Sequence, residues 1–560
     1  MGRRWNKKKK QNAKNDNKVE KPKKDRADPQ GYIVVKKESK DFETFYKSQN
    51  IVPEEEWTEF MTCLRTSLPA AFRITGNTTR AKALLKILKE DFFEPLEKLS
   101  PDDFTPTVSA AAKLAAAQQN GSRQWPVEDE PIKPLELKCL TWYPKGLAYQ
   151  LNLSRRDIRR CEAYWSLHQC LITETDAGSI SRQEAVSMIP PLLLNVLPHH
   201  NVLDMCAAPG SKTAQIIEQM HSSSDPVLGA IPPGVVVAND ADNKRCYLLT
   251  HQAKRLQSPS IIITNHDACF MPNMFYTKPD GSSGKLKYDR ILCDVPCSGD
   301  GTLRKNCDVW GKWNPVNGCN LHGLQLRIAR RGLELLSVGG RMVYSTCSLS
   351  PMENEAVLQR LLLEAAGSVS IVDCSSALPG LKFCSGLTKW TVVTRDMQVL
   401  PTPQDIPLKL SNVYHKHLFP VDEDLHLDRC MRLLPHHQDT GGFFVAVLEK
   451  TAPLPGEKVE GPVAATKDGA AAAAAQPSDT AAKNRNTQRS KQKNNKRRQG
   501  FKEEPYYYLS DVIADWEKDY KAGKEMTPTA PPPNGYTAEE TTDAAATTET
   551  TGATRETAAA

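Results

Sequence analysis

The spacing of apolar and polar residues predicts alternating strands and helices across residues 181–450. Short runs rich in β-branched residues are typical of buried strands, and the stretches between them place apolar residues at helical spacing. Such alternation predicts an α/β fold with a parallel, doubly wound sheet covered on both faces. The expected strands are 202–205, 234–239, 260–265, 289–293, 341–346, 369–373 and 442–447, and the expected helices are 211–220, 243–256, 321–336 and 351–365.

Residues 41–180 carry a weaker α+β pattern beside a cluster of arginines. Aromatic residues next to arginines are typical of single-stranded nucleic-acid binding, although a buried tryptophan and a solvated helix face explain each residue at least as well. We interpret 41–180 as a small RNA-recognition region. Its expected elements are helices at 53–68 and 77–90 and strands at 71–74, 139–144 and 148–153, and the arginines are Arg155, Arg156, Arg159 and Arg160.

The ends of the chain differ from its middle in composition. Only 39% of the 560 residues are hydrophobic, and the net charge of +7 is concentrated in basic runs at 3–24 and 483–502. These features predict disordered tails at 1–40 and 451–560, with one aromatic segment near 500–520 that is able to dock. The basic runs suit contact with RNA and a nuclear-import signal equally well.

The cysteine content and hydropathy argue against several classes of protein. The 15 cysteines are odd in number and include no Cys-x-x-Cys pair, which predicts a reducing compartment and no metal site. No apolar run approaches the roughly 20 residues that a membrane-spanning helix needs. We therefore expect neither membrane association nor a bound metal, and we expect a monomer.

Three of the predicted strands end in segments that cannot continue as regular structure. Strand 202–205 runs into Pro209 and Gly210, strand 289–293 runs into Asp294 and Cys297, and strand 341–346 runs into Cys347. Ligands bind at the carboxyl ends of strands in open α/β sheets. The three ends therefore predict a shared site.

The segment 206–212 has the pattern of a ligand-binding loop, because a Pro-Gly turn and a helix start after a strand direct backbone N–H groups at a ligand. It matches neither the P-loop nor the three-glycine dinucleotide motif. Asp240 and Asp267 follow the next two strands, where carboxylates suit ribose hydroxyls and an adenine amino group. Each acid alone is more often a helix cap, and Asp240 suits the helix that starts near Asn243.

Cys297 and Cys347 are candidate reactive thiols. Taken alone, Cys347 fits a buried small residue that closes a strand better than it fits a nucleophile. A reactive thiol needs a lowered pKa, which nearby cations or backbone N–H groups supply. The candidate cations are Lys212, Arg304 and Lys305.

These motifs resemble the Nop/Sun family of RNA cytosine-5 methyltransferases, and most closely its eukaryotic tRNA-modifying members. The resemblance covers residues 42–450. It is carried by the motifs at 142–144, 183–191, 206–212, 294–301, 345–348, 436–438 and 441–444.

The resemblance implies a Rossmann-like class I methyltransferase sheet, S-adenosyl-L-methionine as cofactor and 5-methylcytosine in RNA, chiefly tRNA, as product. It implies Cys347 as the nucleophile that attacks cytosine, Cys297 as an aid to product release, and Asp294 at the base edge. The alternatives are the same chemistry on rRNA or mRNA, and a non-catalytic RNA-binding scaffold. The implied cofactor contacts are Cys206, Ala207, Ala208, Pro209, Gly210, Ser211, Lys212, Asp240, Asp267 and Asp294.

Two expectations concern the whole chain. A location in the nucleus, including the nucleolus, with a cytoplasmic fraction fits the resemblance and the basic runs. Members of this group carry a folded domain after the catalytic domain, whereas here the resemblance resumes at 500–505 and is lost by 527. We therefore expect a truncated or alternative product, in which RNA affinity differs and the catalytic residues are unaffected.

Overall fold

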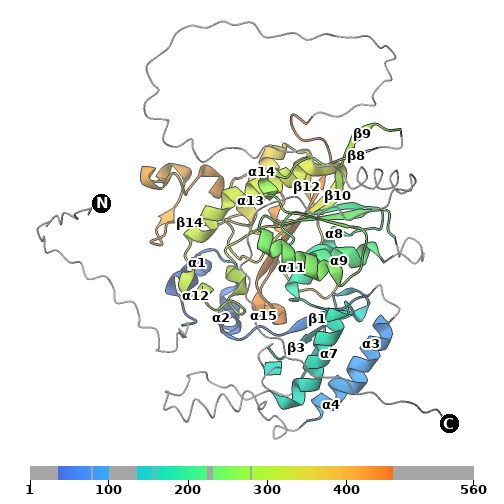
Figure 1. Cartoon of the computed structure of the whole chain (residues 1–560). Coiled ribbons are helices and arrows are strands. Elements are labelled where there is room, and N and C mark those ends of the chain that lie inside the picture. Colours follow the sequence, from blue (N-terminus) through green and yellow to red (C-terminus); the bar gives the residue numbers. More distant parts are fainter. Residues whose placement is uncertain are drawn as a thin grey trace, which may run out of the picture. The chain divides into compact units, whose positions relative to one another are not determined.

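The computed structural model describes residues 36–76, 80–99, 135–154, 157–158, 161–222, 231–277 and 280–457 (Figure 1). Several sequence predictions lie outside these residues: nearly all of both tails, the segment near 500–520, and the four arginines Arg155, Arg156, Arg159 and Arg160.

The centre of the fold is a nine-stranded sheet in the order β13-β16-β17-β11-β10-β5-β6-β7, with β12 also paired to β17. The strands β11, β10, β5, β6 and β7 run parallel to one another, which confirms the predicted α/β class and Rossmann-like half of the sheet. Their bounds are β5 Asn201–Asp204, β6 Val235–Asn239, β7 Ile261–Thr264, β10 Tyr288–Asp294 and β11 Leu336–Thr346.

The prediction of a wholly parallel sheet was wrong for the last strands. β17 (Phe443–Lys450) pairs antiparallel with β11, β12 (Val369–Ile371) and β16 (Met431–Leu433), and β13 (Cys384–Ser385) is antiparallel to β16. Only residues 434–442 join β16 to β17, which is too short for the crossover of about a dozen residues that parallel neighbours require. The short helix α15 (Pro435–Gln438) lies in this connection.

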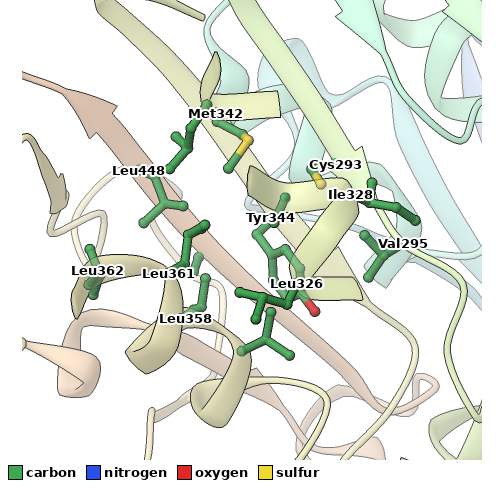
Figure 2. Close-up of a cluster of buried hydrophobic side chains, with 14 of the residues drawn as sticks. Cys293, Val295, Leu326, Ile328, Met342, Tyr344, Leu358, Leu361, Leu362 and Leu448 are labelled. Carbon is green, nitrogen blue, oxygen red and sulfur yellow. The ribbon is translucent and has the colours of Figure 1, made fainter. Parts of the chain in front are cut away.

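Helices cover both faces of the sheet, as the buried strands predicted. Ile291 and Met342 belong to the core under α13 (Val316–Leu335) and α14 (Glu355–Ala365), part of which Figure 2 shows. Leu292 and Val343, one residue on, belong to the core that includes residues of α8 (Ile189–Leu194) and α9 (Ser211–Met220). This division follows from the strand period of two residues.

Three predicted boundaries in this domain shift by four residues or more, and the first is the start of α13, at Val316 rather than at 321. β11 begins at Leu336 rather than at 341, so α13 ends directly where the strand begins. α14 begins at Glu355, because residues 351–354 form a turn instead of the first helical turn. The helix α11 (Asn243–Lys254) packs Leu249 against Ala207 and Ala238.

The N-terminal region contains an antiparallel sheet in the order β2-β3-β1-β4. Its strands are β1 Ala71–Ile74, β2 Leu137–Cys139, β3 Ala148–Leu151 and β4 Ile180–Arg182, with helices α3 Ala81–Ile87, α4 Glu94–Glu97 and α7 Trp165–Asp176. The predicted strand 139–144 was wrong. The chain turns after Cys139, where Tyr143 N donates to Leu140 O at 2.9 Å. Pro144, which lacks an N–H group, then begins a short helical turn in which Lys145 and Gly146 adopt positive φ angles of 60° and 61°.

Polar and apolar contacts join this region to the central domain. Buried Arg73 of β1 forms an ion pair with Glu218 of α9 and donates a 2.9 Å hydrogen bond from Nε to Gln183. The helices α1 (Lys40–Ser48), which the sequence did not predict, and α2 (Trp57–Arg65) pack with Trp310 and Trp313 in one apolar cluster. No helix in the described ranges has the length and apolar character needed to cross a membrane.

Candidate active site

The three strand ends that the sequence singled out lie at one edge of the sheet. β10 is parallel to β5 on one side and to β11 on the other, so Asp294 is aligned with Ser345, and Leu292 with Asp204. Cys347 follows directly after β11. The parallel pairing therefore brings residues 204–212, 294–301 and 345–348 together, as predicted.

The two candidate thiols are neighbours. The sulfur atoms of Cys297 and Cys347 lie 3.2 Å apart, and both side chains are half-buried. The hydrogen bond to Cys347 and burial raise the pKa of the Cys297 thiol well above its usual value. Cys297 thus holds its proton more firmly than an ordinary thiol does.

A cation lies beside this pair. Lys212 Nζ is 2.7 Å from Asp294 Oδ2, and the Ser345 hydroxyl donates to Asp294 Oδ1 at 2.7 Å. Burial acts to lower the pKa of Lys212, but the charge of Asp294, with a further contribution from Cys347, raises it overall. Lys212 is therefore a fixed positive charge that is paired with Asp294 and interacts with Cys347.

The other two candidate cations have different surroundings. Arg304 donates to the backbone oxygens of Thr440 and Ser67 and forms a 2.6 Å ion pair with Asp439. Lys305 is exposed. Of the three cations proposed from the sequence, Lys212 is the one that this geometry favours.

The loop at 206–212 is held from the β6 side. Ala207 N donates to Asn239 O at 2.7 Å, and Ala208 N donates to the Asp240 carboxylate at 3.1 Å. Gly210 has φ 109°, where a residue with a side chain would be strained, and α9 begins at Ser211. The loop thereby turns directly into a helix N-terminus.

The two acids of the neighbouring strands have different environments. Asp240 is buried, pairs with Arg245 at 3.2 Å and does not cap α11, whose N-cap is Asp242. The helix-cap interpretation of Asp240 was therefore wrong. Asp267 is exposed and accepts a hydrogen bond from Cys269 N at 2.9 Å, so it does cap a short turn.

Two buried polar residues at this edge were missed by the sequence interpretation. Asn239 Nδ2 donates to the backbone oxygens of Met205 and His266, so one side chain joins the ends of three strands. Asp204 accepts from the Thr213 hydroxyl at 2.7 Å, and burial raises its pKa to about 7. Both residues could have been found from the sequence, because each is a polar residue at the end of an apolar strand.

This edge fits a nucleoside-containing cofactor. The backbone of the 206–212 loop lies at a helix N-terminus, and carboxylates follow β6 and β7, where ribose hydroxyls and a base amino group find acceptors. Asp204 Oδ1 is buried beside this loop and has no hydrogen-bond partner among the described residues. The donor and acceptor set therefore suits a polar ligand that reaches into this edge.

Comparison with known proteins gives consistent results. A family model described as "16S rRNA methyltransferase RsmB/F" matches residues 191–449. The chain is 51% identical over 443 residues to a Drosophila melanogaster tRNA (cytosine(34)-C(5))-methyltransferase, covering 78% of this chain and 56% of that protein. It is 43% identical over 419 residues to a multisite-specific tRNA:(cytosine-C(5))-methyltransferase of Saccharomyces cerevisiae, covering 74% and 55%. The chain thus spans about half the length of these relatives.

Proposed function

We propose that the chain, which matches the RsmB/F methyltransferase family model through residues 191–449, uses S-adenosyl-L-methionine to form 5-methylcytosine in RNA, chiefly tRNA. The names of the two relatives support tRNA as the substrate class. The observation that carries the chemistry is the 3.2 Å approach of Cys297 and Cys347 beside the Lys212–Asp294 ion pair.

In the proposed reaction, the Cys347 thiol makes carbon 5 of cytosine reactive. Carbon 5 is a weak nucleophile, so the Cys347 thiolate first forms a bond to carbon 6 and moves an electron pair toward carbon 5. Asp294 holds the exocyclic amino edge of the base, and the Lys212 ammonium group offsets the negative charge that develops on the ring. The cofactor supplies one electrophilic methyl group on a positively charged sulfur, and carbon 5 takes it up.

Cys297 acts in the second half of the reaction. The largest cause of its raised pKa is its hydrogen bond to Cys347. That cause disappears when the Cys347 sulfur is bonded to carbon 6, so the half-buried Cys297 thiol then releases its proton to solvent more readily. The resulting thiolate accepts the proton from carbon 5. The electrons of the carbon 5–hydrogen bond re-form the double bond, and Cys347 leaves as a thiolate.

The substrate cytosine must leave its stack to reach these sulfurs, because the reacting atoms of a base are covered inside a helix. We propose that residues 41–180 and the basic runs at 3–24 and 483–502 hold the RNA backbone. Binding should then weaken steeply with salt, as contacts to phosphates do.

The direct test is transfer of a tritiated methyl group from S-adenosyl-L-methionine to unmodified tRNA transcripts. We expect 5-methylcytosine in tRNA, no product with Cys347→Ala, and little product with an rRNA fragment of equal length. Preferential methylation of the rRNA fragment would instead support the alternative that the family description suggests. Absence of transfer to any RNA would support a non-catalytic RNA-binding protein and contradict the proposed chemistry.

We further propose that the protein acts as a monomer in the nucleus, including the nucleolus, with a cytoplasmic fraction. The basic runs at the two ends suit both nuclear import and RNA contact. Imaging of a fluorescent fusion with and without the residues 3–24 run tests the location, and light scattering of the purified chain tests the monomer. An exclusively cytoplasmic signal or a stable dimer would contradict these proposals.

A further inference from the structure

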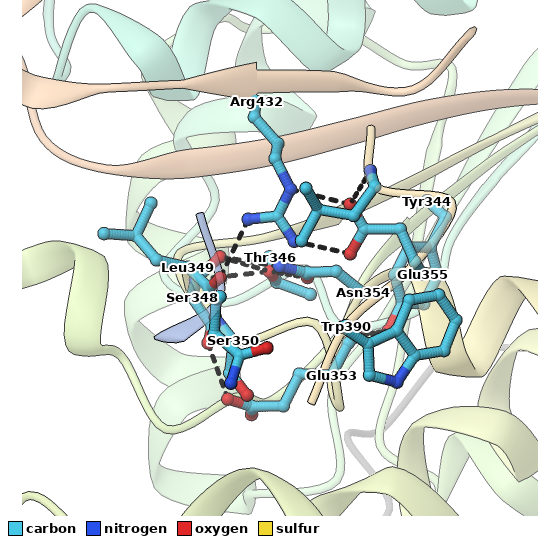
Figure 3. A network of polar contacts seen from close by, with 12 residues as sticks. Tyr344, Thr346, Ser348, Leu349, Ser350, Glu353, Asn354, Glu355, Trp390 and Arg432 are labelled. Carbon is cyan, nitrogen blue, oxygen red and sulfur yellow. Dashed lines mark hydrogen bonds and ion pairs between the residues drawn. The ribbon is translucent and has the colours of Figure 1, made fainter. Parts of the chain in front are cut away.

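The residues that follow the two thiols are joined through one buried carboxylate. Ser298 comes directly after Cys297, and Ser348 directly after Cys347. The hydroxyl groups of Ser298 and Ser348 donate to Glu353 Oε2 at 2.5 and 2.6 Å, and they lie 3.2 Å from each other. Glu353 therefore connects the two loops that carry the sulfur atoms. Figure 3 shows the Ser348 side of this connection, with Glu353 and its neighbours Tyr344, Thr346 and Asn354.

The second oxygen of this carboxylate binds the Cys297 loop again. Glu353 Oε1 accepts from Ser298 N at 2.8 Å and from Gln325 Nε2 at 3.0 Å, and Gln325 also donates to Pro296 O at 2.9 Å. The residues directly before and after Cys297, Pro296 and Ser298, are therefore both held by these hydrogen bonds. These four donors to the carboxylate are neutral, so the contact is set by hydrogen-bond geometry and not by an ion pair.

Glu353 itself is held in place on the sheet. The Tyr344 hydroxyl of β11 donates to Glu353 O at 2.6 Å, and the neighbouring Asn354 side chain binds Thr346 at 2.6 Å and Ser348 O at 2.9 Å. Glu353 is fully buried and therefore shielded from water. Because Glu353 is anchored to β11, its carboxylate fixes the positions of both loops relative to that strand.

We propose that Glu353 is a positioning residue that holds Cys297 and Cys347 at reacting distance, an inference that rests on the proposed two-cysteine reaction. The two loops come from different strands, and the carboxylate supplies acceptors for both at once. Loss of this link lets the sulfur atoms drift apart, and small displacements of reacting groups have large effects on rate.

The charge of Glu353 also affects the pKa of the Cys297 thiol. It contributes to the raised pKa of the Cys297 thiol, after the hydrogen bond to Cys347 and burial. Burial, and then the charge of Asp300, raise the pKa of Glu353 itself. Replacing the carboxylate with a neutral group of equal shape should therefore lower the pKa of Cys297 and leave the positions of the sulfurs unchanged.

The test measures how easily the two sulfurs meet, without RNA or methyl donor. The reduced protein is treated with diamide, which takes up the two electrons and two protons released as the thiols form a disulfide. Peptide mass spectrometry then follows the rate of the Cys297–Cys347 linkage. We expect Glu353→Ala to slow it by about tenfold or more, because disulfide formation demands a narrow range of sulfur positions.

Two further variants test whether the shape of the Glu353 side chain, and not a general disturbance of this turn, sets the rate of disulfide formation. Glu353→Gln keeps the shape, and its NH2 group can take the Oε2 position because the Ser298 and Ser348 hydroxyls can accept as well as donate. Its rate should therefore stay within about threefold of wild type, and its pH profile should move to lower pH. Ser350→Ala is the matched control, because the buried Ser350 hydroxyl in the same turn has no hydrogen-bond partner among the described residues. It should react like wild type.

The proposal is overturned if Glu353→Ala melts like wild type and forms the disulfide at the wild-type rate, or if Glu353→Gln is as slow as Glu353→Ala. If Glu353→Ala does not fold, Ser298→Ala combined with Ser348→Ala removes both hydroxyl links, and a wild-type rate for that variant overturns the proposal. Failure of methyl transfer with normal disulfide formation would instead count against the proposed reaction.

Discussion

The sulfur atoms of Cys297 and Cys347 lie 3.2 Å apart although the residues are 50 positions apart in the sequence. The parallel pairing of β10 with β11 makes this approach possible, because each cysteine lies just beyond the carboxyl end of one strand. Burial and the Cys347 hydrogen bond raise the pKa of the Cys297 thiol, and the proposed reaction gives the two thiols distinct roles.

The two cysteine variants should therefore fail at different steps. Cys347→Ala should reduce methyl transfer by about three orders of magnitude or more and form no covalent RNA complex, because the attacking sulfur is absent. Cys297→Ala should accumulate the covalent complex, because release requires removal of the carbon 5 proton. Denaturing gel shifts of labelled tRNA distinguish them, and the reverse pattern would show that the roles are exchanged.

Lys212→Met should lower kcat by about 100-fold, because it removes the fixed positive charge beside Asp294 and Cys347. The methionine keeps most of the side-chain length, so the change is mainly one of charge. Lys254→Met, at the exposed end of α11, is the matched control and should keep wild-type kcat. Equal rates for Lys212→Met and wild type would rule out an electrostatic role for Lys212.

Asp204 should make the protein less stable as the pH rises. Burial raises its pKa from 3.8 to about 7, so the folded state holds this proton more tightly than the unfolded state does. Stability from this group is present below pH 4 and is lost toward pH 7, with a slope of at most about 1.4 kcal/mol per pH unit. The difference in free energy of unfolding between wild type and Asp204→Asn should therefore fall across this range in urea titrations. A difference that rises with pH would contradict the assignment.

Asn239→Ala should weaken both the fold and the cofactor site. It leaves the backbone oxygens of Met205 and His266 without their donor, at a cost of about 1–3 kcal/mol per buried group. Because Asn239 joins three strand ends, we expect the affinity for S-adenosyl-L-methionine to fall about tenfold in calorimetric titrations. Asn243→Ala, at an exposed position on α11, should change stability by less than about 0.5 kcal/mol. Equal affinities for the two variants would argue against this role of Asn239.

The sequence by itself determined the α/β class, the parallel strands and the three strand ends that form the site. These features are local: β-branched runs indicate strands, and Pro209, Gly210 and Pro296 prevent their continuation. Both cysteines could be singled out because each lies next to such an end. Their assignment to nucleophile and helper came from the family resemblance, and residue types alone did not distinguish them.

Only the tertiary structure decided the direction of β16 and β17, the choice of Lys212 over Arg304, and the links made by Asn239 and Glu353. Arg304 and Lys212 look equivalent along the chain, yet folding places one beside Asp439 and the other beside Asp294. In the sequence, Glu353 likewise has no feature that distinguishes it from other acids near a helix start. Only the fold brings the Ser298 and Ser348 hydroxyls to its carboxylate. The physical reason is that spacing encodes the period and the ends of each element, whereas side-chain partners depend on packing between segments far apart in the chain.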